Sequence, residues 1–411
     1  MSQRYYSLDV FRGATVALMI LVNNPGSWAH IYSPLEHAPW HGVTPTDLVF
    51  PFFLFAVGNA LAFVMPRLEA GGARLFWKKV LTRTVLIFGI GLFLTWWPFF
   101  QYINNQLVFK GWTWTGEDGL IHGIRVMGVL ARIALCYFLA SVIIFYLKPR
   151  GAFLAGLLLL LFYWLLCIAG NPSDPYSMTG WFGRIIDIRV FGEPHVYHGE
   201  TLNGQPFAFD PEGLMSTIPA IVQVIFGFLV GDFIRKRGAH IQELSRKPAV
   251  QGLELYQTLT ILFLAAVALL FTGYCWGLSF PINKKIWSSS YVCYTTGLAI
   301  LAICTLIYAI EIKKVRSWWT RFFDVFGKNA LFIFAFSSFL PKILWLIRWP
   351  DHTDESGKAV YLDPWHWWYQ KVCIHVPGAP ENGSLIFALS IILLFWSICY
   401  YLDRKKIYIK V

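Results

Sequence analysis

Long apolar segments recur along the whole chain and constrain its fold more than any other feature. Runs such as LLLLLFYWLLCIAG and LTILFLAAVALLF contain no charged residue. Apolar segments of about 18 residues or more predict transmembrane helices, and the lack of strict alternation between apolar and polar residues argues against a membrane β-barrel. Charged residues make up 14% of the chain, against about 25% in a typical soluble protein. We therefore predict an all-α polytopic membrane protein.

Counting the apolar runs predicts about ten membrane spans, which we assign to a single transmembrane domain over residues 1–411. Only a short polar segment precedes the first run, so we expect that run to stay as a membrane anchor and not to be removed as a signal peptide. We expect no separate soluble domain at either end, and the longest connections to fold back over the bundle. The predicted spans are 13–26, 44–65, 80–98, 125–147, 152–170, 213–234, 253–275, 290–310, 328–347 and 384–402, with the longest connections at 171–212 and 348–383.

The formal charge of +11 is distributed unevenly along the chain. Lysine and arginine gather in every second connection between the predicted spans, on the same side as both termini. The positive-inside rule assigns that side to the cytoplasm. The charges stand beside the membrane in dispersed groups, which argues against nucleic-acid binding. The basic groups are Arg67, Arg74, Lys78, Lys79 and Arg83; Lys148 and Arg150; Arg235, Lys236, Arg237, Arg246 and Lys247; Lys313, Lys314, Arg316 and Arg321; and the segment DRKKIYIK.

The seven cysteines do not form a recognisable framework. Most stand inside predicted spans, where cysteine behaves as a small apolar residue, and no Cys/His spacing of the zinc type occurs. Cys275, Cys293 and Cys373 stand near the outer side and could pair, although no spacing requires it. We expect no disulfide framework and no metal cofactor.

Two polar residues near the end of the first span have chemistry that a simple connection does not need. Asn23 and Asn24 precede a Pro-Gly pair that ends the helix. Their amides either cap the helix or, in the case of Asn23, donate a hydrogen bond to a polarised carbonyl. His37 is either an interfacial histidine or an imidazole that takes a proton from a nucleophile or accepts an acyl group itself.

Two segments combine an acid with a proline at the start of a predicted helix. In TPTD, Thr44 suits the N-cap, and Asp47 satisfies free amide groups and complements the helix dipole. The same carboxylate stands near His37 in the sequence and can orient its imidazole. In FDPEG, Asp210 and Glu212 either start a helix or face the outer compartment, where a cationic substrate would arrive.

Several basic residues in or near the spans are candidates for binding anionic groups. Arg125 and Arg132 stand seven residues apart and therefore share one face of the fourth predicted span. Arg125 can reach the outer surface and contribute to substrate binding, whereas Arg132 lies deeper and is expected to meet a phosphate, a carboxylate or a developing negative charge. Lys284 and Lys285 face the outer side and either bind an anion or pair with acids such as Asp210.

On the cytoplasmic side, Arg12 and Lys328 are candidates for binding phosphate. Arg12 and Asn23 are separated by about 16 Å of helix at 1.5 Å per residue. One end of the first span can therefore hold a cytoplasmic phosphate while the other end meets a transferred group. The phosphates could be bound by Arg12 and Lys328 or, deeper in the bundle, by Arg132, and the sequence leaves both alternatives open.

These residues stand in segments that together resemble the heparan-α-glucosaminide N-acetyltransferase family of transmembrane acyltransferases, which includes bacterial relatives. The segments cover nearly the whole chain in one order, so their combination is specific although each alone is not. They are SLDVFRG, HAPWHGVTPTDLVFPFFLFAVG, IRVMGVLARI, FDPEGLMSTIPAIV, FPINKKIWSSSYV and FFDVFGKNALFIF.

The resemblance implies acetyl transfer across a membrane, from cytoplasmic acetyl-CoA as co-substrate to the amine of glucosamine or a related amino sugar in the periplasm or a lumen. It assigns the active histidine to His37 through its HAxW context, and the active-site asparagine to Asn23 through its place at the end of the first span. It also implies a homodimer in contact with lipid, in a bacterial inner membrane. The luminal N-terminal domain of the lysosomal members is not in this sequence, and the loop from Asn23 to His37 is slightly longer. A free or short amino sugar is therefore an alternative to a long polysaccharide.

Function can still be assigned in more than one way. In an acyltransferase, His37 would deprotonate the incoming amine or carry the acetyl group, and Asn23 would stabilise the oxyanion. A secondary transporter for amino sugars or their derivatives, with His37 as a gate, is the alternative, but such carriers usually need acids deep within spans. A non-catalytic scaffold would not need a buried Arg132. Binding of acetyl-CoA separates the enzyme from the transporter.

Overall fold

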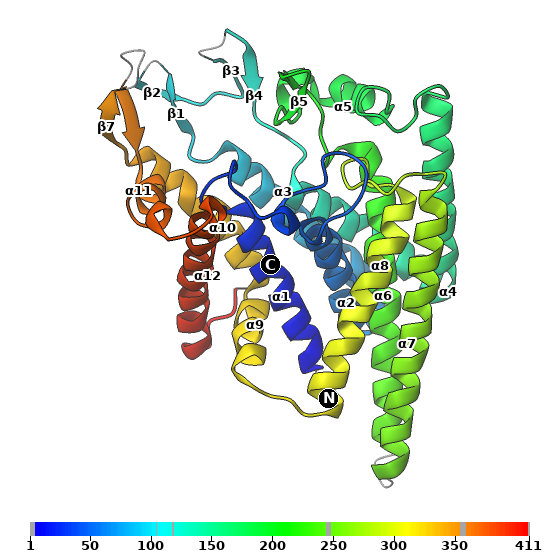
Figure 1. The fold of residues 1–411 in the computed structure, drawn as a ribbon. Coiled ribbons are helices and arrows are strands. Elements are labelled where there is room, and N and C mark those ends of the chain that lie inside the picture. Colours follow the sequence, from blue (N-terminus) through cyan, green and yellow to red (C-terminus); the bar gives the residue numbers. More distant parts are fainter. Residues whose placement is uncertain (1–4, 104, 117–118, 244–247, 354–358, 410–411) are drawn as a thin grey trace.

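The computed structural model describes residues 5–103, 105–116, 119–243, 248–353 and 359–409. Arg246, Lys247 and Lys410, which belong to the basic groups predicted above, lie outside these ranges. Figure 1 shows a bundle of long helices with short strands gathered at one end. The long helices are α1 (Tyr6–Asn23), α2 (Val49–Ala70), α3 (Gly72–Trp96), α4 (Val129–Gly170), α6 (Leu214–Glu243), α7 (Pro248–Gly277), α8 (Ser289–Leu306), α9 (Trp318–Lys328), α10 (Ala330–Leu346) and α12 (Pro380–Arg404).

In the described part of the chain, eight helices are long and apolar enough to cross a membrane, or up to nine if the bent pair α9 and α10 is one span. These two helices meet at Asn329 with a bend of 78°. The polytopic helical membrane protein that the composition predicts is therefore confirmed. Each predicted span overlaps one of the helical segments. The number of crossings and the cytoplasmic location of the termini stay predictions.

Helix α4 contains both the fourth and the fifth predicted spans. Lys148, at its middle, has dihedral angles of φ 58° and ψ 174°, which no helix allows. Its ammonium lies 3.0 Å from the Glu69 carboxylate at the end of α2. Both halves of α4 pack against α6, because Cys136 contacts the carbonyl of Thr217 and Gly156 lies against Val222. The chain thus reverses direction at Lys148.

Within the described residues the connections also contain four two-stranded hairpins, which the sequence analysis did not predict. All of these pairs are antiparallel and only three to five residues long per strand. Strands this short, within aromatic and glycine-rich loops, carry too little periodicity to be found in the sequence. The strands are β1 (Phe100–Ile103), β2 (Gln106–Phe109), β3 (Thr113–Thr115), β4 (Ile121–Gly123), β5 (Glu200–Leu202), β6 (Gln205–Phe207), β7 (Trp349–Thr353) and β8 (Ala359–Leu362), and the connections also hold α5 (Gly183–Phe191) and α11 (Pro364–Lys371).

The bundle has two ends of different chemistry. We call one the loop end: it comprises the last turn of α1, residues 24–48, the hairpins and residues 278–288, and its strands and α5 lie at the top of Figure 1. We call the other the basic end: it comprises the first turn of α1, the junction of α2 with α3, and the last turns of α6 and α12. There Gly238 of α6 lies against the Tyr5 ring, and Lys328 contacts Asp403 of α12.

Glycines allow the central helices to approach one another closely. A Cβ atom at Gly13 of α1 would lie 1.7 Å from the carbonyl oxygen of Phe323 in α9. Likewise, a Cβ atom at Gly58 of α2 would lie 2.0 Å from the carbonyl oxygen of Val224 in α6. Small residues at helix contacts are typical of membrane bundles, where packing replaces the hydrophobic effect. These contacts fix α1 and α2, which position the candidate site.

Several predicted span boundaries differ from the observed ones, and three of them bear on the site. Helix α1 begins at Tyr6 instead of residue 13, because its polar first turns are satisfied by protein: the Ser7 N–H donates to Glu311, at 3.0 Å. Arg125 lies before α4 and not within it, since the backbone is extended at Gly128. Helix α6 begins at Leu214, so Pro211 does not occupy its first turn.

Candidate active site

A cavity of about 260 Å³ opens at the loop end and gathers several of the predicted site residues. Its walls come from the end of α1, the loop before α2, the segment before α4, the β5 hairpin and residues 284–285. We call it the loop-end cavity. It is lined by Met19, Val22, Asn23, His37, Ala38, Thr46, Asp47, Val49, Phe50, Arg125, Val129, Tyr197, Glu200, Pro211, Glu212, Lys284, Lys285 and Phe334.

His37 and Asp47 form a hydrogen-bonded pair on one wall of this cavity. The Nδ1 atom of His37 lies 2.7 Å from Oδ1 of Asp47. The imidazole is 42% exposed, whereas the carboxylate is only 1% exposed. A buried carboxylate on Nδ1 favours the tautomer with the proton on that nitrogen, which leaves a lone pair on Nε2. An imidazole in this state can act as a base or a nucleophile.

Asp47 has both of the roles that the sequence suggests for it. Its second oxygen, Oδ2, accepts hydrogen bonds from the backbone N–H groups of Thr44 and Ala38, both at 3.0 Å. With the Thr44 hydroxyl at 3.1 Å, this forms the N-terminal cap of the short helix Pro45–Leu48 that leads into α2. The cap therefore holds rigidly the carboxylate that orients His37.

Lys284, in the connection between α7 and α8, completes this group. Its ammonium lies 3.4 Å from Asp47 Oδ1, and 3.0 Å and 3.3 Å from Nδ1 and Nε2 of His37. Burial lowers the pKa of Lys284 below its ordinary value, although Asp47 opposes that shift. With a neutral imidazole, the positive charge of Lys284 balances the negative charge of Asp47.

Arg125, Asp210 and Glu212 form a second charged group at the cavity. Arg125 donates to both oxygens of Asp210, at 3.0 Å and 2.5 Å, and also to Glu212. Its guanidinium stacks on the ring of Tyr197, 4.5 Å from the centroid. Burial alone would raise the pKa of Glu212, but the adjacent Arg125 charge lowers it. Arg125 and Glu212 line the cavity, whereas Asp210 is buried behind them.

Asp187 caps α6 and was not identified from the sequence. Its Oδ1 accepts a hydrogen bond from the Leu214 N–H at 2.8 Å, the position for which the FDPEG pattern suggests Asp210 or Glu212. Asp210 instead accepts from the Glu212 N–H at 2.9 Å. Because Asp187 stands in a distant connection, no local sequence signal could identify it.

Lys285 pairs with Glu200 of the β5 hairpin at 2.6 Å. Lys284 contacts Asp47 and Lys285 contacts Glu200, so neither lysine contacts Asp210, the partner that the sequence analysis suggested. Glu200 and Tyr197 are cavity residues that the sequence analysis missed, because the hairpin reaches the cavity from a connection far along the chain. The only available signal was the expectation that residues 171–212 fold over the bundle.

Asn23 is the last residue of α1 and lines the cavity. Its neighbour Asn24 has the capping role, since its side-chain amide donates to the Ile20 carbonyl at 2.8 Å. The side chain of Asn23 is therefore not required to end the helix.

Arg132 lies in the protein interior, with 0% exposure. It donates to the Ser216 hydroxyl and to the Gly213 carbonyl, the latter at 3.3 Å, and its guanidinium lies 5.0 Å from the Trp287 ring centroid. As far as the described residues extend, Arg132 does not line the loop-end cavity, nor the second cavity, which lies between α1 and α2. The structure thus does not bring Arg132 together with the other predicted phosphate ligands.

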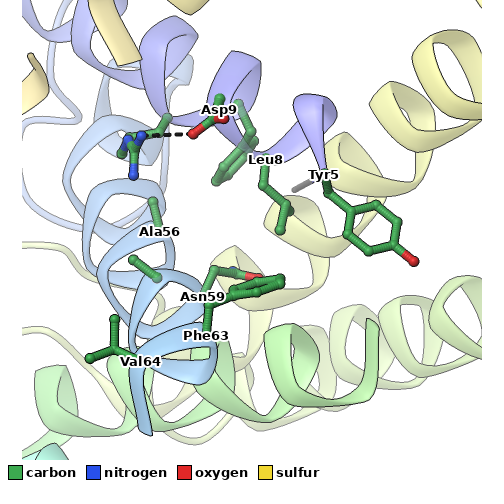
Figure 2. A pocket seen from close by; sticks show the side chains of 10 residues that line it. Tyr5, Leu8, Asp9, Ala56, Asn59, Phe63 and Val64 are labelled. Atoms are coloured by element: carbon green, nitrogen blue, oxygen red, sulfur yellow. Dashed lines mark hydrogen bonds and ion pairs between the residues drawn. The ribbon is translucent and has the colours of Figure 1, made fainter. Parts of the chain in front are cut away.

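A second cavity, of about 320 Å³, lies at the basic end between α1 and α2. Figure 2 shows Leu8 and Asp9 of α1 facing Ala56 and Asn59 of α2 across it. Arg12 lines this cavity and donates to Asp9 and to the Gly327 carbonyl, both at 2.8 Å. We call it the α1–α2 cavity.

Lys328 does not line the α1–α2 cavity, so far as the structure describes it. Its ammonium contacts Asp324 at 2.7 Å and Asp403 at 3.0 Å. Of the predicted pair of phosphate ligands, only Arg12 therefore lines this cavity as described, and Lys328 is already engaged by carboxylates. Within the described ranges, no group of three or more His, Cys, Asp or Glu side chains is arranged for a metal ion.

Comparison with known proteins agrees with the resemblance found in the segments. No protein-family model matches the chain. Human heparan-alpha-glucosaminide N-acetyltransferase (Homo sapiens) is 25% identical over 401 residues, which cover 86% of this chain and 56% of the relative. The mouse protein of the same name (Mus musculus) is 25% identical over 379 residues, which cover 81% and 53%. The chain spans about half the length of the curated relatives it matches. It is a distant relative of the heparan-α-glucosaminide N-acetyltransferases.

Proposed function

We propose that the chain transfers an acetyl group from acetyl-CoA, which enters from the basic end, to the amine of glucosamine or a related amino sugar in the loop-end cavity. One observation carries the proposal: His37 lines this cavity beside Asn23, with its Nδ1 bonded to the buried Asp47. The relatives, which are named as N-acetyltransferases of a glucosaminide, support the same reaction class.

In this reaction the amine nitrogen attacks the thioester carbonyl carbon, and the carbon–sulfur bond breaks. Nε2 of His37 accepts the proton that the amine loses and returns it to the departing sulfur, so that CoA leaves as a thiol. The Asn23 amide donates a hydrogen bond to the oxyanion of the tetrahedral intermediate. In an alternative course the acetyl group first bonds to Nε2 and is then taken by the amine. Both courses use the same atom of His37.

The charged groups of the cavity suit an amino sugar. Glu212 and Glu200 offer carboxylate oxygens, while Arg125, Lys284 and Lys285 offer N–H donors. Alternating donors and acceptors can bind the hydroxyl groups of a sugar and orient its amine. We therefore assign Arg125 and Glu212 to binding of the acceptor sugar, with Asp210 holding Arg125 in place.

For the donor, we assign Arg12 to a phosphate group, because it lines the α1–α2 cavity. This cavity and the loop-end cavity lie toward opposite ends of α1. Arg12 and Asn23, which line them, are separated by about 16 Å along the helix. The thin flexible arm of acetyl-CoA can span such a distance although its nucleotide cannot cross lipid. Lys328 and Arg132 remain weaker assignments for the phosphates.

The direct test is transfer from labelled acetyl-CoA to glucosamine by purified protein. His37→Ala should lower the rate by about 10²- to 10⁴-fold, because general-base catalysis or the acyl acceptor is lost, while acetyl-CoA binding stays unchanged. His366→Ala is a matched control, since His366 also pairs through Nδ1 with an aspartate, Asp363, at 2.6 Å, but does not line the loop-end cavity as described.

The outcomes separate the possible functions. Binding of acetyl-CoA without acetylation of glucosamine would show that the acceptor is another amine. Failure of the wild type to bind acetyl-CoA would contradict the proposal and favour the secondary transporter, which the relatives do not favour. The homodimer and the bacterial inner membrane stay predictions.

A further inference from the structure

A third cavity, of about 420 Å³, lies at the basic end between α2, α3 and the first half of α4. We call it the α2–α3 cavity. It is formed where α2 ends and α3 begins, so that its walls combine juxtamembrane cations with apolar residues of the helices. It is lined by Val64, Arg67, Leu68, Leu75, Lys78, Lys79, Thr82, Arg83, Leu86 and Tyr137.

The lining of this cavity contains four cations, Arg67, Lys78, Lys79 and Arg83, and no acidic residue. None of the four forms an ion pair with another residue in the ranges that the structure describes. Other cations at the basic end do have such partners: Arg237 contacts Glu254 at 3.0 Å. Several positive charges around one hollow create a field that favours an anion.

Arg83 is the cation that most needs a partner. It stands eleven residues into α3, about 16 Å along the helix from Gly72. Its guanidinium lies 4.9 Å from the Tyr137 ring centroid, and its buried Nε has no hydrogen-bond partner in the described part of the chain. Only 17% of the apolar stretch of α3 is buried inside the protein, so most of this helix faces lipid. The unsatisfied Nε–H group of Arg83 is therefore available to an anion that enters the cavity.

The rest of the lining is apolar and suits a hydrocarbon chain beside a phosphate. Val64 and Leu86 are exposed on the helices, next to the cations. Val64 also lines the α1–α2 cavity, so the two cavities share a wall. A ligand with phosphate at one end and an alkyl chain at the other would match both parts of the surface.

We propose that the α2–α3 cavity binds the phosphate group of an amphiphilic ligand, held by Arg67, Lys78, Lys79 and Arg83. Arginine binds phosphate through paired N–H groups and lysine through a point charge. This chemistry has two sources: the headgroup of an anionic phospholipid, as in other basic pockets between membrane helices, or the phosphates of acetyl-CoA. The second source rests on the function proposed above, whereas the first does not.

The test compares the wild type with the double variant Lys79→Gln/Arg83→Gln in detergent. One arm measures retention of dioleoyl phosphatidylglycerol by native mass spectrometry, with phosphatidylcholine as the uncharged comparison. The other arm measures binding of adenosine 3′,5′-bisphosphate, the phosphate-bearing end of CoA, by calorimetry. Loss of two cations should weaken the relevant ligand about tenfold to thirtyfold. Neither arm depends on catalysis, so a failure of the proposed acetyl transfer would not affect them.

Arg74→Gln/Lys314→Gln is the matched control, because it removes the same charge from exposed residues that do not line the cavity as described. Weaker binding of phosphatidylglycerol alone identifies a lipid site, and weaker binding of the bisphosphate alone identifies a CoA site; weakening of both shows that the cavity accepts either. The proposal is overturned if neither ligand is affected, if the control has the same effect, or if phosphatidylcholine is lost equally. If the double variant does not fold, Lys79→Gln alone provides the comparison.

Discussion

The loop-end cavity and the α2–α3 cavity both contain several charged side chains, but they differ in how these charges are neutralised. At the loop end, each cation of the lining contacts a carboxylate: Lys284 contacts Asp47, and Lys285 contacts Glu200. At the α2–α3 cavity, Arg83 and its neighbours have no carboxylate within the described ranges.

This difference indicates different tasks. Paired charges hold side chains in fixed positions, and catalysis requires such positions before the substrate arrives. Unpaired charges keep their attraction for a ligand that supplies the missing anion. We therefore propose that the loop end is organised as a reaction site and the α2–α3 cavity as a binding site. Variants that break one pair or remove one unpaired charge test this distinction.

The largest effect is expected from Asp47→Asn. The amide retains the size of the side chain, but it removes the negative charge and can present an N–H group to Nδ1 of His37. The opposite tautomer would then place the proton on Nε2, where the base is needed. We expect the acetylation rate to fall about 10³-fold, which corresponds to about 4 kcal/mol of transition-state stabilisation.

Asp363→Asn is the control for Asp47→Asn. Asp363 caps α11 by accepting from the Trp365 N–H at 2.8 Å and pairs with His366, so it repeats both contacts of Asp47 outside the loop-end cavity. A similar loss of activity in both variants would mean that helix capping, and not orientation of His37, explains the effect.

A smaller effect, on stability, is expected from Arg125→Gln. This change leaves the buried carboxylate of Asp210 and the partly buried carboxylate of Glu212 without their cation. Breaking a buried ion pair on one side costs about 3 kcal/mol or more. Thermal unfolding in detergent should show a clear loss of stability for this variant. A melting temperature equal to that of the wild type would show that the acids find another partner, and the loop end would not depend on its pairs.

Asp187 is a buried loop-end carboxylate without a paired cation in the residues that the structure describes, and its effect on stability should depend on pH. Burial raises its pKa to about 7, with a smaller contribution from Asp210. Since the unfolded chain ionises this group near pH 3.8, the unfolded state binds fewer protons, and stability falls as pH rises from about 4 to about 7. Asp187→Asn removes this penalty. The free energy of unfolding of the variant, relative to that of the wild type, should therefore increase by about 2 kcal/mol from pH 5 to pH 8.

The gain is measured as the difference in melting temperature between Asp187→Asn and the wild type at the two pH values. The exposed Asp174 provides the control variant Asp174→Asn, which should show no such dependence. An equal difference at pH 5 and pH 8 would contradict a raised pKa for Asp187.

Local patterns in the sequence predict much of the helical bundle and part of the site. Long apolar runs identify the helices because lipid requires them. The TPTD pattern predicts the cap made by Thr44 and Asp47, and the short distance along the chain predicts the approach of Asp47 to His37. Both predictions depend on neighbours in sequence, which is why they agree with the observed geometry.

Contacts between distant segments could not be predicted in this way. The partner of Lys285 is Glu200, which a short hairpin brings to the cavity. Lys328 looks available in the sequence, but folding places Asp403 of the last helix 3.0 Å from it. Arg132 is placed behind the cavity wall by the packing of α4 on α6, where it donates to the Gly213 carbonyl and the Ser216 hydroxyl. Such positions depend on tertiary packing, and the periodicity of one segment contains no information about it.

The smallest effect is expected from Arg83→Gln in the absence of ligand. Because Arg83 has no carboxylate partner in the described chain, its removal breaks no ion pair and reduces repulsion from Lys79 and Arg67. We expect the free energy of unfolding to change by no more than about 0.5 kcal/mol, and the small gain to vanish at high salt, which screens the repulsion. Thermal unfolding of delipidated protein at low and high salt measures this. If Arg83→Gln destabilises the protein as much as Arg125→Gln does, Arg83 has a structural partner, and the contrast between the two cavities is wrong.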